Sequence, residues 1–397
     1  MKRNPNMGRI TKNYLFSEVE MQKRELGENN PGVDPIALSV GDVRDPLPKT
    51  ISSACAEAGI ALGMEGGYGG YGPERGEYLL RRAIAEKEYE GRIDPEEIFV
   101  SDGAKCDLGR LQTLFGSTVS IAVQDPSYPV YVDGSRLQGV TDVRFMPCLP
   151  ENGFVPDFGK VFPVDVIYFC SPNNPTGEAT SRERLEELVL LARKNRSVIV
   201  FDAAYARYVS TPGIPRSIFE IEGADETAVE VNSFSKSAGF TGIRLGWTVV
   251  PKRLTYDDGS SIREDWSRLV STLFNGASRL AQAGGRAALT DEGMREAAAL
   301  REGYSENGRL LRQALEEKGY EVFGGLHVPY LWVRVPECTR RSTSLHLFRH
   351  LLEECRIVTT PGSGFGSAGE GYVRISAFGK REDVREAVRR LRSPRSR

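Results

Sequence analysis

The sequence predicts an α/β protein with a mostly parallel central sheet in a large domain, followed by a smaller α+β domain. Three observations support this fold class. Short apolar runs alternate with amphipathic helical patterns through the middle of the chain. The runs are apolar throughout, as expected of strands that are buried on both faces. Several of them end in polar residues, and ligands of open α/β sheets bind at the carboxyl ends of strands.

The strands and helices can be assigned in order along the chain. The expected strands of the large domain are residues 98–100, 119–123, 164–170, 198–201, 227–231 and 246–250. After about residue 290, a helical pattern over 292–318 leads to expected strands at 330–335 and 372–376, with a helix at 344–355 between them. We therefore expect an N-terminal arm with part of the small domain at 1–45, the large domain at 46–290 and the small domain at 291–397.

Length and composition exclude several classes of protein. A chain of 397 residues suggests two or three domains. Its net charge of −2 offers no broad basic face for nucleic acid. With three histidines, six scattered cysteines and no CxxC or HExxH motif, neither a zinc site nor a histidine-based catalytic triad is expected.

The cysteines and the apolar segments of the sequence indicate the cellular compartment of the protein. Most cysteines sit in apolar runs, where a free cysteine behaves as a small buried hydrophobe. The N-terminal residues 1–5 lead into polar sequence without the apolar segment of a signal peptide. No run approaches the roughly 18 apolar residues of a membrane span. We expect a cytoplasmic protein without a membrane or nucleic-acid partner.

Lys236 is the strongest candidate for a catalytic residue. It lies in segment 232–247 among small, hydroxyl and apolar neighbours, with no carboxylate nearby in sequence. Such surroundings lower the pKa of an amine and favour its nucleophilic neutral form. Ser233, Ser235 and Arg244 add donors suited to a phosphate. A lysine that forms a Schiff base beside a phosphate indicates pyridoxal 5'-phosphate (PLP) chemistry, although an exposed lysine in a Gly/Ser loop is the alternative.

Two further segments offer groups for the ring of this cofactor. Asp202 follows the apolar run 198–201, where its carboxylate can hold the pyridine nitrogen protonated, although such an aspartate is often only a helix cap. Tyr205 can donate a hydrogen bond to the phenolic oxygen. In segment 171–177, two prolines and a glycine fix a tight turn that projects Asn174, whose amide can reach the same oxygen.

Two more segments are weaker when taken alone. Segment 101–105 precedes a helix whose first N–H groups can bind phosphate, with Gly103 allowing close approach, but an ordinary capped helix start is equally consistent. Segment 125–129 places Tyr128 where it can stack on a flat heterocycle, although a core or surface role is commoner for a lone tyrosine.

The order of these elements resembles the fold-type I PLP enzymes, and within them the class I and II aminotransferases, over nearly the whole chain. The resemblance implies an aspartate-aminotransferase-like fold in which Lys236 carries the cofactor as a Schiff base. The other implied cofactor contacts are Asp202 at the ring nitrogen, Asn174 and Tyr205 at the phenolic oxygen, Tyr128 on the ring, and Ala104, Lys105, Ser233, Ser235 and Arg244 at the phosphate. Arg374 matches the arginine that clamps the substrate α-carboxylate, and an arginine inside a short strand also needs an anionic partner.

Finer features resemble the LL-diaminopimelate aminotransferases, and most closely the chlamydial-type members. The segments that carry this resemblance are 3–5 with 15–16, 101–105, 271–278, 330–333 and 360–366. It implies a ping-pong exchange between LL-2,6-diaminopimelate with 2-oxoglutarate and tetrahydrodipicolinate with glutamate, in lysine and diaminopimelate biosynthesis. It also implies a homodimer in which Tyr71 and Asn275 enter the site of the second subunit. The implied substrate-binding residues are Tyr14, Gly41, Glu74, Lys105, Tyr128, Asn174, Asn275 and Arg374.

Other functions remain open at this point. The nearest are another class I aminotransferase, for aspartate, aromatic or broad substrates, and a PLP-dependent β-lyase. A PLP-sensing transcription regulator needs a DNA-binding module, and the first 45 residues are too short and poorly patterned for one. A dinucleotide-binding enzyme is disfavoured because no GxGxxG motif follows the first strands.

Overall fold

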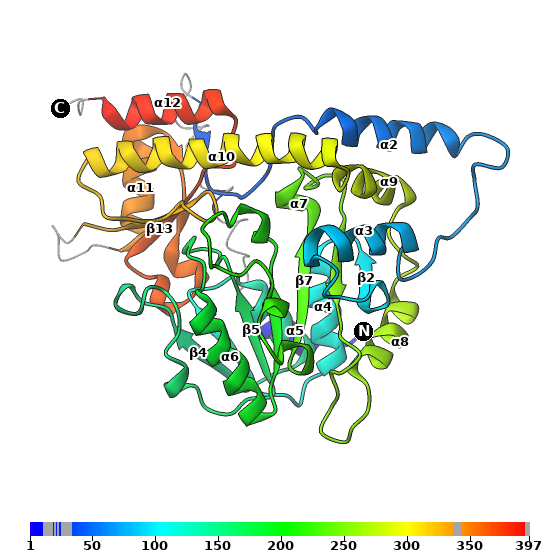
Figure 1. The fold of residues 1–397 in the computed structure, drawn as a ribbon. Coiled ribbons are helices and arrows are strands. Elements are labelled where there is room, and N and C mark those ends of the chain that lie inside the picture. Colours follow the sequence, from blue (N-terminus) through cyan, green and yellow to red (C-terminus); the bar gives the residue numbers. More distant parts are fainter. Residues whose placement is uncertain (11–18, 20, 22–23, 25–33, 337–342, 394–397) are drawn as a thin grey trace.

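The larger part of the molecule is built on a seven-stranded sheet (Figure 1). This computed structural model describes residues 1–10, 19, 21, 24, 34–336 and 343–393. In order across the sheet, the strands are β2 (Ile98–Ser101), β8 (Gly246–Val249), β7 (Ala228–Ser233), β6 (Val198–Asp202), β5 (Val166–Cys170), β3 (Ile121–Asp125) and β4 (Val143–Pro147). The neighbours from β7 to β4 are parallel, and only β8 runs against its neighbours. The expected mostly parallel sheet is therefore confirmed.

Six of the seven strands were expected within two residues of their observed ends, and β4 was not. Residues 143–147 include Arg144 and Pro147 and are only partly buried, unlike the other edge strand, β2, which is buried throughout. A partly exposed strand lacks the continuous apolar run that marked the other six.

Helices cover both faces of this sheet. They are α3 (Tyr78–Tyr89), α4 (Ala104–Phe115), α5 (Val130–Gln138), α6 (Arg182–Asn195), α8 (Ile262–Leu273) and α9 (Arg279–Ala288), with α2 (Lys49–Ala61) packed on α9. Alternate residues of β5 enter different hydrophobic clusters, Ile167 with Leu188 of α6 and Tyr168 with Leu111 of α4. Burial on both faces explains why these strands are apolar throughout.

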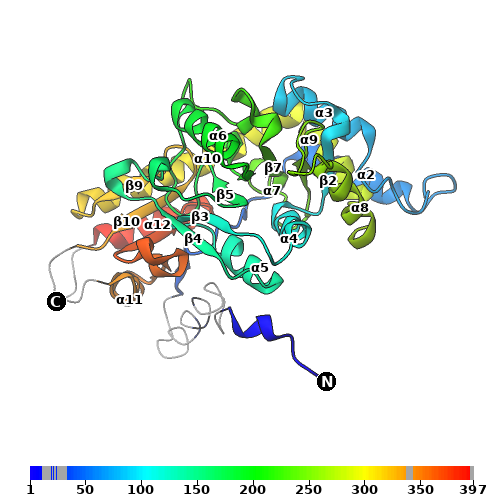
Figure 2. The same ribbon diagram turned by 90° about the horizontal axis from the view of Figure 1, so that it is seen from below.

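The smaller part is built on an antiparallel sheet of β12 (Thr360–Pro361), β13 (Tyr372–Ser376), β10 (Tyr330–Arg334) and β9 (Val322–Gly324). Its helices α11 (Ser344–Cys355) and α12 (Arg381–Arg392) lie on the opposite side of the central sheet from α2 and α8 (Figure 2). Near the N-terminus, β1 (Ile36–Ala37) pairs with β11 (Ile357–Val358), which supports assigning part of 1–45 to the small domain. The boundaries after residues 45 and 290 stay a prediction.

One long helix, α10 (Asp291–Glu317), runs from the larger part to the smaller one (Figure 1). It begins after Thr290, whose side chain caps the backbone N–H of Gly293, and two acidic residues follow in its first turn. Within the described part of the chain, no helix is long and apolar enough to cross a membrane.

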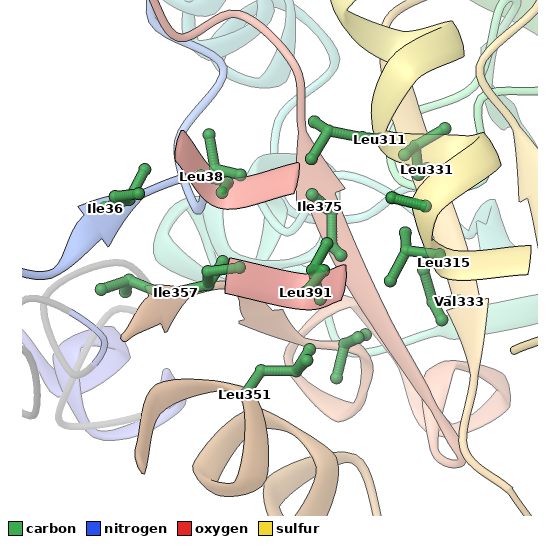
Figure 3. Packing of buried hydrophobic residues seen from close by; sticks show 14 of the residues in the cluster. Ile36, Leu38, Leu311, Leu315, Leu331, Val333, Leu351, Ile357, Ile375 and Leu391 are labelled. Atoms are coloured by element: carbon green, nitrogen blue, oxygen red, sulfur yellow. The ribbon is translucent and has the colours of Figure 1, made fainter. Parts of the chain in front are cut away.

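The core of the smaller part joins residues from both ends of the chain (Figure 3). Ile36 and Leu38 pack with Leu311 of α10 and Leu391 of α12 around the antiparallel sheet.

Because Leu311 is fully buried, Leu311→Ala is expected to lower the free energy of unfolding by about 2–5 kcal/mol. Urea unfolding measures this loss. Leu190→Ala is the matched control because Leu190 is 63% exposed; equal effects of the two variants would contradict the assignment of this core.

Candidate active site

The carboxyl ends of five strands meet at one edge of the central sheet. Strands β2, β3, β5, β6 and β7 run in the same direction, and their registers place Cys170 beside Asp202, and Asp202 beside Val231. A cavity of about 460 Å³ opens beside this edge. Its lining residues are Val40, Gly41, Asp42, Ala104, Lys105, Leu108, Tyr128, Tyr131, Cys170, Asn174, Asp202, Ala204, Tyr205, Ser233, Ser235, Lys236, Thr241, Arg244, Tyr330 and Arg374.

Lys236 lies in this cavity on α7 (Phe234–Ser237), the short helix that directly follows β7. Its Nζ donates a hydrogen bond to the carbonyl oxygen of Gly41. Burial lowers the pKa of Lys236 to about 8, although the nearby Asp42 carboxylate opposes this shift. At pH 7 such an amine is neutral in about one molecule in ten, against about one in three thousand for an unshifted lysine. The position therefore favours a nucleophile and base.

Asp202 is a buried acid at the end of β6. Its Oδ2 accepts a hydrogen bond of 2.7 Å from the Tyr131 hydroxyl, and its Oδ1 accepts one of 3.0 Å from the backbone N–H of Ala204. Burial raises the pKa of Asp202, and these two bonds oppose the rise. A carboxylate held in this way is suited to pair with a cationic ring nitrogen.

Arg374 joins the small sheet to the cavity. It lies on β13, is 1% exposed, and donates from Nη1 to the Asn174 side-chain oxygen at 2.6 Å and from Nη2 to the carbonyl oxygen of Ser39. These bonds fix the planar guanidinium at the cavity wall, where a carboxylate can bind it. The arginine expected inside a short strand therefore reaches the cavity.

A hollow suited to phosphate lies at the start of α4. Gly103 precedes the helix without a capping side chain, so the first N–H groups of α4 have no partner within the helix. Arg244 Nη1 donates to the Ser235 hydroxyl at 3.1 Å, and a Cβ atom at Gly103 would lie 2.5 Å from Arg244 Nη2. The absence of a side chain thus leaves a space between a guanidinium and a helix N-terminus, and this arrangement is suited to an anion. Together with Lys236 and Asp202, this hollow fits the PLP that the sequence resemblance implies.

Gly103→Ala is expected to weaken PLP binding by about tenfold or more, because the new methyl group crowds Arg244 and the backbone φ of 121° disfavours a side chain. Equilibrium binding of PLP to the apoenzyme measures this loss. Gly109→Ala is the control, since a Cβ at Gly109 of the same helix meets nothing within 4 Å. Unchanged PLP affinity in Gly103→Ala would show that the phosphate binds elsewhere.

Most of the residues predicted from the sequence meet in this cavity. Those that line it are Gly41, Ala104, Lys105, Tyr128, Asn174, Asp202, Tyr205, Ser233, Ser235, Lys236, Arg244 and Arg374. Three others do not line it within this chain and are exposed, namely Tyr71, Glu74 and Asn275. Tyr14 lies outside the described residues.

Sequence reasoning missed two tyrosines of the cavity. Tyr131 comes three residues after Tyr128 at the start of α5, a spacing that places both on one side of a helix turn. Tyr330 begins β10, and its hydroxyl lies 2.9 Å from the Tyr205 hydroxyl. The sequence contains a signal only for Tyr131, namely its spacing from Tyr128. Tyr330 and Tyr205 are 125 residues apart, and only the packing of the folded chain brings them together.

Comparison with known proteins gives consistent matches over the whole chain. Residues 33–391 match the family described as aminotransferase class I and II. The chain is 51% identical to the LL-diaminopimelate aminotransferase of Protochlamydia amoebophila, over 99% of this chain and 97% of that protein. The solved L,L-diaminopimelate aminotransferase of Chlamydomonas reinhardtii matches with a TM-score of 0.94 and 50% identity, covering 98% of each chain. A single mutant of Thermus thermophilus aspartate aminotransferase matches with a TM-score of 0.85 and 25% identity, covering 98% and 99% of the two chains.

Proposed function

The chain belongs to the class I and II aminotransferases, and from this premise we propose that it transfers an amino group from LL-2,6-diaminopimelate to 2-oxoglutarate. The products are tetrahydrodipicolinate and glutamate, which places the reaction in lysine and diaminopimelate biosynthesis. The observation that carries the proposal is the cavity that brings Lys236, Asp202 and Arg374 together. The choice of substrate is supported by the half-identical relatives that act on LL-diaminopimelate.

The enzyme depends on PLP and has the aspartate-aminotransferase-like fold of type I. When bound, PLP supplies an aldehyde that takes up the substrate amine and a pyridinium ring that draws electrons from the substrate Cα. Asp202 would hold the proton on the ring nitrogen, while Asn174 and Tyr205 would donate hydrogen bonds to the phenolic oxygen. The phosphate would be held by Ala104, Lys105, Ser233, Ser235 and Arg244, and Tyr128 would lie against the ring.

Lys236 and Arg374 act on the substrate. Arg374 binds the α-carboxylate through its guanidinium, which fixes the orientation of the Cα–H bond. With PLP bound, the free Lys236 amine would take the proton from Cα and return a proton during the transfer. A pKa of about 8 suits this base near neutral pH. The same lysine serves both half-reactions, as a ping-pong exchange requires.

The substrate assignment is tested by supplying purified enzyme with LL-diaminopimelate and 2-oxoglutarate and measuring glutamate. Aspartate, phenylalanine and tyrosine are supplied in parallel as amino donors. We expect the highest kcat/KM with LL-diaminopimelate. Absence of glutamate from that donor would contradict the substrate proposal, whereas pyruvate or ammonia released without an oxo acid would identify a β-lyase.

The enzyme works as a homodimer with sites at the subunit interface. The segments that carry Glu74 and Asn275 lie side by side, because Gly276 lies against Pro73 and Glu74 accepts a hydrogen bond from Ser271. Exposed large apolar side chains occur close by in sequence, with Tyr68 and Tyr71 shortly before Glu74 and Leu273 shortly before Asn275. An exposed apolar area of this kind is suited to a second copy of the chain.

Mixed dimers test whether Tyr71 acts across the interface. Lys236→Ala and Tyr71→Ala subunits are each expected to be poorly active alone. Unfolding and refolding them together forms mixed dimers, in which one of the two sites contains both an intact Lys236 and an intact Tyr71. Activity is therefore expected to reappear on mixing. Failure to recover activity, with mixed dimers demonstrated by differential tags, would contradict the shared site.

We place the enzyme in the cytoplasm. The five described cysteines, which include Cys148 and Cys170 in the core, are free thiols. Free thiols at all the described cysteines are typical of a reducing compartment.

A further inference from the structure

Tyr330 contacts three parts of the active site at once. Its hydroxyl lies 2.9 Å from the Tyr205 hydroxyl, and its ring centre lies 4.5 Å from the Arg374 Cζ atom. A side chain at position 41 would collide with the Tyr330 hydroxyl, so the Gly41 backbone lies directly against it. The carbonyl oxygen of that same glycine accepts the hydrogen bond from Lys236.

Either hydroxyl of this pair can be the hydrogen-bond donor, and a cofactor that accepts from Tyr205 selects one of the two directions. A phenol has one proton to donate and can also accept. If Tyr205 donated to Tyr330, it would have no proton left for the phenolic oxygen of the cofactor. When Tyr330 donates instead, the Tyr205 proton remains available to the cavity. Burial raises the pKa of both hydroxyls, so both keep their protons at neutral pH.

The ring of Tyr330 has a second role, which does not involve its hydroxyl. The guanidinium of Arg374 lies over the face of this ring at a distance typical of a cation–π contact. The strands that carry the two residues are neighbours in the small sheet, where Trp332 of β10 pairs with Arg374 of β13. The ring thus supports the guanidinium from one side while Asn174 and Ser39 hold its nitrogen atoms.

We propose that Tyr330 is a positioning residue that directs the Tyr205 proton toward the cofactor and supports Arg374 for the substrate carboxylate. The proposal rests on the proposed function, since it assigns Tyr205 and Arg374 their roles there. The hydroxyl and the ring of Tyr330 make separable contributions. Tyr330→Phe removes the hydroxyl alone, and Tyr330→Leu removes the hydroxyl and the aromatic ring.

The hydroxyl is tested by titrating the visible absorbance of the bound cofactor in the absence of substrate. A hydrogen bond to the phenolic oxygen stabilises its negative charge. When Tyr330 donates to Tyr205, it polarises the Tyr205 hydroxyl and strengthens that bond, so losing the Tyr330 donor favours the protonated chromophore. In Tyr330→Phe the absorbance change is therefore expected to move to higher pH by about half a unit or more. Tyr372→Phe is the control, because the Tyr372 hydroxyl contacts Arg334 on the same small sheet and does not line the cavity.

The ring is tested by steady-state kinetics with the best amino donor. Tyr330→Phe keeps the ring and is expected to keep the KM for that donor within about twofold, whereas Tyr330→Leu raises it about tenfold. A wild-type titration curve in Tyr330→Phe, or an unchanged KM in Tyr330→Leu, would overturn the corresponding part of the proposal. The titration needs no substrate, so it stands even if LL-diaminopimelate proves to be the wrong donor.

Discussion

Lys236→Ala lowers the turnover of the aminotransferase by about 10⁴-fold or more, which is the largest effect expected of any substitution in the chain. The variant loses both the amine that carries PLP and the base that moves the Cα proton, and the base alone accounts for about 10²–10⁴. Glutamate formation under saturating substrates measures the loss. Lys194→Ala on the exposed side of α6 is the control and is expected to leave turnover unchanged.

Borohydride reduction gives the same substitution a chemical readout. In the wild-type enzyme, reduction followed by peptide mapping is expected to attach the cofactor to Lys236 alone. The Lys236→Ala variant is expected to yield no labelled lysine. Labelling of a different lysine, or an unchanged cofactor absorbance in the variant, would show that the covalent site has been misassigned.

Asp202→Asn is expected to produce the second-largest effect, a loss of about 10²–10³ in kcat/KM. The variant keeps the shape of the side chain but removes a buried negative charge, and unpairing a buried charge corresponds to about 3–5 kcal/mol. The ring nitrogen then no longer holds its proton firmly, so electrons leave the substrate Cα less readily. Steady-state kinetics at saturating PLP separate this effect from weaker cofactor binding.

Glu230→Gln provides a matched control for Asp202→Asn. Glu230 is also a buried acid on the central sheet, but it accepts hydrogen bonds from Tyr89 and Ser217 and does not line the cavity. We expect this variant to alter stability while leaving kcat/KM nearly unchanged for the folded enzyme. A similar loss of kcat/KM in both variants would remove the special role of Asp202.

The sequence was most informative where burial and polarity change abruptly. The run 198–201 is apolar because it is buried on both faces, and Asp202 stands out because it ends that run at the ligand-binding edge. Arg374 stands out for the same reason within an otherwise buried strand. Physical patterning therefore singled out Asp202 and Arg374, whereas Gly41 was implied only by the family resemblance.

The missed residues share a different property. The Tyr330 and Tyr131 side chains are amphipathic, and in sequence they resemble core aromatic residues. Their hydroxyl partners, Tyr205 and Asp202, are 125 and 71 residues away along the chain. Such contacts depend on how strands and helices pack together, which local pattern does not encode. Strand β4 was not predicted for a related reason, because a partly exposed strand lacks a continuous apolar run.

The most direct test of the central claim is a single half-reaction. Purified enzyme loaded with PLP is mixed with LL-diaminopimelate in the absence of any oxo acid, and the oxo product and cofactor absorbance are followed together. We predict one equivalent of product per active site and a matching loss of visible absorbance, both of which stop until 2-oxoglutarate restores the absorbance and yields one equivalent of glutamate. Product that accumulates beyond one equivalent without an acceptor, or no change in absorbance, would contradict the account.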